Sequence, residues 1–394
     1  MDTMKFLRRC AAPLASLAFA LAGGANAAEL KIGLLLSQTG PLSSYGVPMR
    51  SAAEYAAKVV NDSGGINGHK LVVLLEDDTS NPATFLNGLN RLIEKEKVLA
   101  LVGPITSGFF QAGAPIVREA GLSMISPTAT APNLTTGNPG AFRNNPSEDV
   151  NIPSLLKLMK SQHPEIRSIA VIYDNKEAAD KVIGGLYEKL APEVGWEVQN
   201  VTTFLSGQLN YSDVVSKALR KKPDIVAKSL RGKPDVVAVA AHAEDAANVA
   251  RELRRQGYKN IILGGTPTVS QDYIKIGGDA ANNTYVVVPY YHGAKTEQNA
   301  KFVDGYTKFT GRTVVDPWEA STFESVGMIA QAMRAANVTG DPEKAAAERK
   351  AIQGKLAATR GYPGLIGNID FDKDRVAEKP AVIIRVQDGR WQAL

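Results

Sequence analysis

Short apolar runs alternate with longer amphipathic segments through the first third of the chain. The apolar runs have the length and composition of strands buried on both faces, and they occupy residues 30–36, 71–75, 98–102 and 122–125. Between them, hydrophobic positions recur with helical spacing, as in the segment that Pro82 opens. This alternation predicts a mainly parallel sheet covered by helices on both faces.

A second series of the same kind begins beyond residue 143. Its predicted strands occupy residues 168–173, 197–204, 236–240, 261–263 and 285–288, with closing strands at 367–371 and 381–386. Because 394 residues exceed one ordinary domain of about 100 to 200 residues, we expect two compact lobes. The predicted fold class is therefore α/β, with two doubly wound lobes.

The first 27 residues have the pattern of a secretory signal peptide. Three basic residues among the first nine precede an apolar stretch at 11–22, and small residues follow up to Ala27, where we place the cleavage site. The apolar stretch is too short for a membrane-spanning helix, which needs about 20 residues. We expect residues 1–27 to be removed and the mature chain to be periplasmic.

Composition narrows the class of protein. Hydrophobic residues make up 44% and charged residues 22%, which is typical of a globular protein. The net charge of +5 comes from basic residues scattered along the chain, so nothing indicates a nucleic-acid partner. The one cysteine, Cys10, lies in the predicted leader, which excludes a disulfide framework in the mature chain.

Motifs for catalysis, cofactors and metals are absent from the sequence. The chain has no phosphate-binding loop, dinucleotide fingerprint, zinc-protease motif or nucleophile elbow, and its four histidines lack ligand spacing. We therefore expect no enzyme activity, no cofactor and no metal. An exported hydrolase with a non-motif triad stays an alternative, because triads assemble across a fold.

Hydroxyl-rich loops follow three of the predicted strands. They occupy residues 37–39, 106–108 and 128–130. Ligands of open parallel sheets bind beyond the carboxyl ends of the strands, and free amides at the start of a helix attract anions. Ser107 stands just before a predicted helix, so it fits either an anion contact or an ordinary helix N-cap.

Five segments resemble those of a known family, in the family's order. They are residues 37–46 (SQTGPLSSYG), 61–68 (NDSGGING), 76–78 (EDD), 102–104 (VGP) and 125–134 (ISPTATAPNL). Together they resemble the type I periplasmic substrate-binding proteins of ABC importers, specifically the leucine/isoleucine/valine-binding branch. The resemblance covers essentially the whole mature chain and is strongest from 31 to 145.

This resemblance implies a domain organisation and a mechanism. The family has two α/β lobes joined by three crossing segments, which we place near 144, 288 and 360. Lobe 1 would comprise residues 28–144 plus 289–360, and lobe 2 residues 145–288 plus 361–394. A small-molecule ligand would close the lobes, and a cognate ABC permease in the inner membrane would recognise the closed, monomeric protein.

In lobe 1, the resemblance also implies ligand contacts. Ser107 matches the family serine that holds the ligand carboxylate, and Thr130 matches the threonine of the Pro-x-Ala-Thr loop. Thr128 and Ala129 match its backbone contacts, and Tyr45 matches a tyrosine that covers the ligand.

Lobe 2 departs from the amino-acid binders at two positions. Ala178 stands where they have an aromatic ring, and Thr266 stands where they have the acidic residue that holds an ammonium group. A neutral hydroxyl cannot neutralise a buried ammonium group. His242 falls at a family cleft position, either as a structural residue or as a second donor to an anion.

The predicted function is capture of a small carboxylate-bearing solute for an ABC importer, with branched-chain or other hydrophobic amino acids first. The departures at Ala178 and Thr266 favour the alternative of an aromatic or other organic acid. A ligand-sensing regulatory protein of the same fold is a further alternative.

Overall fold

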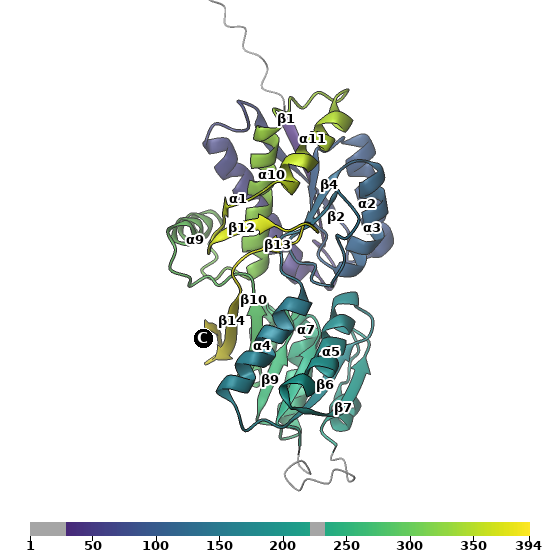
Figure 1. Cartoon of the computed structure of the whole chain (residues 1–394), viewed down its shortest axis with the longest axis vertical. Helices are drawn as coiled ribbons and strands as arrows, with labels where there is room; N and C mark the ends of the chain where they lie inside the picture. Colours follow the sequence, from purple (N-terminus) through teal and green to yellow (C-terminus); the bar gives the residue numbers. More distant parts are fainter. Residues whose placement is uncertain (1–28, 221–232) are drawn as a thin grey trace, which may run out of the picture.

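A computed structural model of the chain describes residues 29–220 and 233–394. Figure 1 shows two lobes stacked along the long axis of the molecule. The predicted signal peptide, residues 1–27, lies outside the described residues. No helix in the described ranges is long and apolar enough to cross a membrane.

Lobe 1 is built on a parallel five-stranded sheet in the order β2-β1-β3-β4-β5. Its strands are β1 (Glu29–Leu36), β2 (Lys70–Asp77), β3 (Ala100–Val102), β4 (Ser123–Ser126) and β5 (Ala141–Arg143). Its helices are α1 (Ser43–Asp62), α2 (Pro82–Asn90), α3 (Ser107–Glu119), α9 (Glu297–Thr310), α10 (Pro317–Ala335) and α11 (Ala345–Ala357). Successive residues of β1 alternate between two cores, since Leu34 and Leu36 pack on the α1 side and Leu35 packs with α2 and α3.

Lobe 2 contains a seven-stranded sheet in the order β15-β14-β10-β9-β8-β6-β7. Its strands are β6 (Ser168–Asp174), β7 (Glu197–Phe204), β8 (Val236–Ala240), β9 (Ile261–Gly264), β10 (Thr284–Val288), β14 (Val382–Gln387) and β15 (Arg390–Ala393), of which the last two are antiparallel to their neighbours. Its helices are α4 (Glu148–Gln162), α5 (Ala178–Leu190), α6 (Ser212–Ala218), α7 (Ala243–Arg255) and α8 (Gln271–Gly277). Helices α4 and α5 cover one face of the sheet, and α6 and α7 cover the other. The predicted α/β class with two doubly wound lobes is confirmed.

The resemblance implies that residues 361–394 belong to lobe 2, and residues 382–393 do join the lobe 2 sheet, but the part between α11 and residue 379 packs with lobe 1. It forms a small antiparallel sheet of β11 (Tyr362–Pro363), β12 (Asn368–Phe371) and β13 (Ala377–Glu378). The Phe371 ring contacts that of Phe142 in β5 at 5.3 Å between centroids. We therefore propose that the third crossing lies at 379–381, because the apolar residues of this segment are buried on lobe 1. The boundaries near 144 and 288 stay predictions.

The parallel order of the strands brings the loops that line the pocket to one edge of each sheet. The loops after β1, β3 and β4 leave the carboxyl edge of the lobe 1 sheet, and those after β6, β8 and β9 leave the same edge in lobe 2. These loops carry the side chains that line the space between the lobes.

Candidate functional site

A small pocket lies between the two lobes, where the strand-end loops meet. Its lining residues come from both lobes: Tyr45, Ile105, Thr106, Ser107, Thr128, Ala129, Thr130, Glu177, Ala179, His242, Pro267 and Trp318. Six of the eight residues predicted from the sequence are in this set. The pocket has a volume of about 20 Å³, room for about one water molecule. The lobes are therefore closed, and a larger ligand requires the lining side chains to move or the lobes to separate.

Ser107 is the first residue of α3, and it is not the helix cap. Thr106 is the N-cap, and its hydroxyl accepts a hydrogen bond from Phe109 N at 3.2 Å. The Ser107 hydroxyl instead accepts from Thr130 N and Ala131 N at 3.3 and 3.2 Å. Since both are contacts to its oxygen, its proton stays available for an acceptor in the pocket.

Thr128 and Thr130 have different roles. The Thr128 hydroxyl donates to Ile105 O at 2.5 Å and so holds the loop to the end of β3. The Thr130 hydroxyl is buried and makes no hydrogen bond among the described residues. Burial raises the pKa of nearby Glu148 to about 7, and the Thr130 hydroxyl is among the groups that oppose this rise. Thr130 is therefore the better placed of the two threonines to donate to a ligand.

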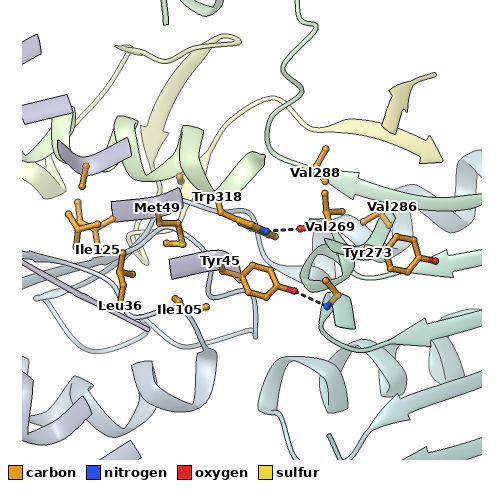
Figure 2. Close-up of a cluster of buried hydrophobic side chains, with 14 of the residues drawn as sticks. Leu36, Tyr45, Met49, Ile105, Ile125, Val269, Tyr273, Val286, Val288 and Trp318 are labelled. Carbon is orange, nitrogen blue, oxygen red and sulfur yellow. Dashed lines mark hydrogen bonds between the residues drawn. The ribbon is translucent and has the colours of Figure 1, made fainter. Parts of the chain in front are cut away.

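Tyr45 joins the lobes across the pocket. Its hydroxyl donates to Pro267 O at 2.8 Å and accepts from Ala243 N at 2.7 Å, and both partners belong to lobe 2. Trp318 makes a second connection, because its Nε1 donates to Val269 O at 2.8 Å. Figure 2 shows two of these hydrogen bonds reaching from lobe 1 to lobe 2, that of Tyr45 with Ala243 N and that of Trp318 with Val269 O. Burial raises the pKa of Tyr45, so the hydroxyl keeps its proton.

A close approach of backbone places Tyr45 at this position. The next residue is Gly46, and a Cβ atom added there would lie 1.8 Å from Ser37 O. Only glycine allows α1 to start this close to the end of β1. The resemblance of residues 37–46 to the family loop thus has a steric basis.

His242 is a charged residue of the lobe 2 wall. Its Nδ1 lies 3.1 Å from Asp180 Oδ2, and the Asp180 side chain is fully buried. Burial lowers the pKa of His242, but Asp180 and, more weakly, Glu177 outweigh it and raise the pKa to about 9. The ring is therefore protonated at neutral pH, and its Nε2 makes no hydrogen bond to the described residues.

Glu177 lines the pocket, although it was not among the residues predicted from the sequence. It is the N-cap residue of α5, one position before Ala178, which does not line the pocket. Its carboxylate makes no hydrogen bond or ion pair with any described residue. Burial raises the pKa of Glu177, against a lowering effect of His242. A signal was present in the sequence, since the acid directly precedes the position where the ring is missing.

Thr266 is turned away from the pocket. Its side chain is fully buried, its hydroxyl accepts from Asn151 Nδ2 at 3.3 Å, and its backbone N donates to Glu148 Oε1 at 3.1 Å. Pro267 lines the pocket in its place. The tight turn at Thr266–Thr268 directs the side chain into lobe 2, a direction that the resemblance to the amino-acid binders did not predict.

Comparison with protein-family models identifies the family to which this chain belongs. The model described as periplasmic binding protein matches residues 29–390. The chain belongs to this family. It is 26% identical over 387 residues to the Leu/Ile/Val-binding protein homolog 3 of Brucella melitensis, covering 96% of this chain and 97% of that protein. The predicted resemblance is confirmed, and the family implies an extracytoplasmic location.

Solved structures share the fold. The branched-chain amino acid transporter substrate binding protein LivJ of Streptococcus pneumoniae, in complex with isoleucine, has a TM-score of 0.81 at 23% identity, over 93% of this chain and 98% of that one. A solute binding protein of an R. palustris ABC transporter, in complex with benzoate, has a TM-score of 0.80 at 19% identity, over 93% and 96%. Among residues 29–220 and 233–394, no group of three or more His, Cys, Asp or Glu side chains could hold a metal ion.

Proposed function

We propose that this protein is the solute-binding component of an ABC importer and captures a small carboxylate-bearing solute between its two lobes. It is exported by the segment 1–27, acts in the periplasm as a monomer, and delivers its ligand to a cognate permease in the inner membrane. Family membership supports this role. The names of relatives that bind leucine, isoleucine and valine support amino acids as the first ligand class to test.

The observation that carries the proposal is the set of hydrogen-bond donors on the lobe 1 wall. Thr106 caps α3, which leaves the Ser107 hydroxyl proton and the first amides of the helix for another acceptor. Thr130 contributes a second hydroxyl beside them, which makes no well-formed hydrogen bond to a described residue although it acts on the nearby Glu148 carboxyl. Donors at a helix N-terminus favour an anionic group, and a carboxylate satisfies several of them at once.

The remaining predicted contacts divide between the lobes. Tyr45 and the loop of Thr128 and Ala129 would enclose the carboxylate end, and protonated His242 would face the ligand from lobe 2. Ligand binding would stabilise the closed arrangement because it adds contacts that exist only when both walls meet.

An aromatic or other organic acid is a second candidate ligand. The inward orientation of Thr266 favours it, since the pocket has no acid at the position where amino-acid binders hold the ammonium group. A ligand-sensing regulatory protein would use the same pocket but would not require a permease.

Thermal unfolding of the ligand-stripped protein tests the proposal. Branched-chain amino acids, aromatic amino acids, their deaminated acids and benzoates are added in turn, and a ligand that binds the native state raises the midpoint. We expect a rise with carboxylates and none with the corresponding amides or alcohols. Recovery of the bound solute unchanged, in a 1:1 ratio, distinguishes binding from the hydrolase alternative. A rise with amides as large as with acids would contradict the carboxylate assignment.

A further inference from the structure

Carboxylates gather at the wall of the pocket in lobe 2. Three of them, those of Asp174, Glu177 and Asp180, lie close enough to His242 to raise the pKa of the ring. Lys176 is a second cationic side chain nearby, but it is exposed and does not line the pocket. The facing wall in lobe 1 has hydroxyl and amide donors but no charged side chain among its lining residues. The two walls therefore differ in the charge that they favour.

Two of these three acids are occupied by the protein itself. Asp174 accepts hydrogen bonds from Lys176 N at 2.8 Å and Ser206 N at 3.1 Å. Asp180 is held through Oδ2 by His242, while its Oδ1 has no partner among the described residues but is fully buried behind the pocket and does not line it. Both acids therefore already have donors from their own lobe.

Glu177 differs from them in two ways. It is the carboxylate that lines the pocket, and it has no donor among the described residues. His242 influences it only at longer range, because the Nδ1 of the ring is committed to Asp180. A partly buried carboxylate without a partner is unfavourable, and an occupant of the pocket that brings a cationic donor would remove this cost.

We propose that Glu177 binds an ammonium group of the ligand. The inference rests on the proposed function, because the carboxylate of the same ligand would occupy the donors around Ser107. The ligand is then a small zwitterion, an amino acid, held with its carboxylate on lobe 1 and its ammonium group on lobe 2. The start of α5 supplies the counter-charge that Thr266 cannot.

His242 and the ammonium group coexist because each has a carboxylate of its own, Asp180 for the ring and Glu177 for the ammonium group. With Asp180 paired to the ring, the added cation meets the carboxylate of Glu177 as its nearest unpaired charge. This arrangement discriminates against deaminated acids, which would leave Glu177 without a partner.

The test compares Glu177→Gln with the matched control Glu244→Gln. Glu244 is an exposed glutamate in the first turn of α7 that does not line the pocket. Affinities for α-amino acids, for ω-amino acids and for their deaminated acids are measured by calorimetry on ligand-stripped protein, after circular dichroism has confirmed that each variant is folded. We expect E177Q to weaken binding of the amino acid at least about 30-fold, and to leave or improve binding of the deaminated acid. E244Q should bind like the unsubstituted protein.

Glu177→Asp provides a second variant that keeps the charge, and we expect it to retain amino-acid binding better than E177Q does. Equal affinity of E177Q and the unsubstituted protein for the amino acid would overturn the inference. Binding of deaminated acids alone by the unsubstituted protein would also overturn it, while leaving the carboxylate function intact. If neither class binds, both proposals are wrong.

Discussion

Replacing Tyr45 with phenylalanine removes one hydroxyl group and, with it, both hydrogen bonds that this side chain makes to lobe 2. In the closed arrangement, Ala243 N loses its acceptor and Pro267 O loses its donor, and the phenylalanine ring brings no polar atom to replace them. When the lobes are apart, water satisfies all three groups. The cost of the substitution therefore falls on the closed state alone.

The magnitude follows from the burial of these groups. Leaving a buried backbone donor unsatisfied costs about 1–3 kcal/mol. A shift of that size in the equilibrium between open and closed states lowers the population of the closed form about 5- to 150-fold. Because the ligand binds most tightly to the closed form, its affinity should fall by a comparable factor.

Two measurements check Tyr45→Phe. Small-angle scattering of the ligand-free protein reports lobe separation, and calorimetry with the best ligand of the thermal screen reports affinity. We expect a more open ligand-free form and weaker binding. Tyr258→Phe is the control, because that buried hydroxyl donates to Ile261 O at 2.6 Å within lobe 2. An unchanged scattering profile for Tyr45→Phe would refute the reasoning, even if affinity fell, since affinity alone also reports direct contact with the ligand.

Three further predictions concern buried charges. Lys379→Met leaves Glu324 as a buried charge without its partner, and urea unfolding should show a loss of about 3–5 kcal/mol that Lys379→Met combined with Glu324→Gln partly restores. Burial opposes protonation of His242 but Asp180 favours it more, and the pKa of the ring rises from 6.5 to about 9. Protonated His242 therefore adds to the free energy of unfolding in full below pH 6.5, and this contribution is lost as the pH rises towards 9. Urea titrations at several pH values should show that slope in the unsubstituted protein and much less of it in His242→Gln. Burial raises the pKa of Glu148 from 4.5 to about 7. The free energy of unfolding should therefore fall as the pH rises from 4.5 to 7, and Glu148→Gln should make this fall smaller.

Elements with strong local signals were predicted well from the sequence. The strands β7 and β8 match the predicted residues 197–204 and 236–240, because turn residues bound each of them and apolar or β-branched residues fill them. The helix α4 was missed, since Pro153 interrupts its helical pattern. The three-residue strand β5 was missed because so short a run has no period of its own.

The residues of the candidate site were predicted less completely, because sequence motifs do not show which way a side chain points. Ser107 and Thr130 were found from loop motifs, and both line the pocket, although their role in ligand binding stays a prediction. Ala178 and Thr266 do not line the pocket, because the turn geometry at the start of α5 and after β9 decides which neighbour faces it. In both places the adjacent residue lines the pocket instead, Glu177 and Ala179 beside Ala178, and Pro267 beside Thr266.

The small volume of the closed pocket bears on how a ligand can bind beside Tyr45. A pocket of about 20 Å³ cannot hold an amino acid together with the present positions of Tyr45, His242 and Trp318. The ligand therefore binds when the lobes are apart, and the lining side chains move to make room as the lobes close on it. The hydrogen bonds of the Tyr45 hydroxyl with Ala243 N and Pro267 O then hold the closed, ligand-bound form together with the ligand's own contacts. A zwitterion adds such contacts at both walls, because its carboxylate meets the donors of lobe 1 and its ammonium group meets Glu177.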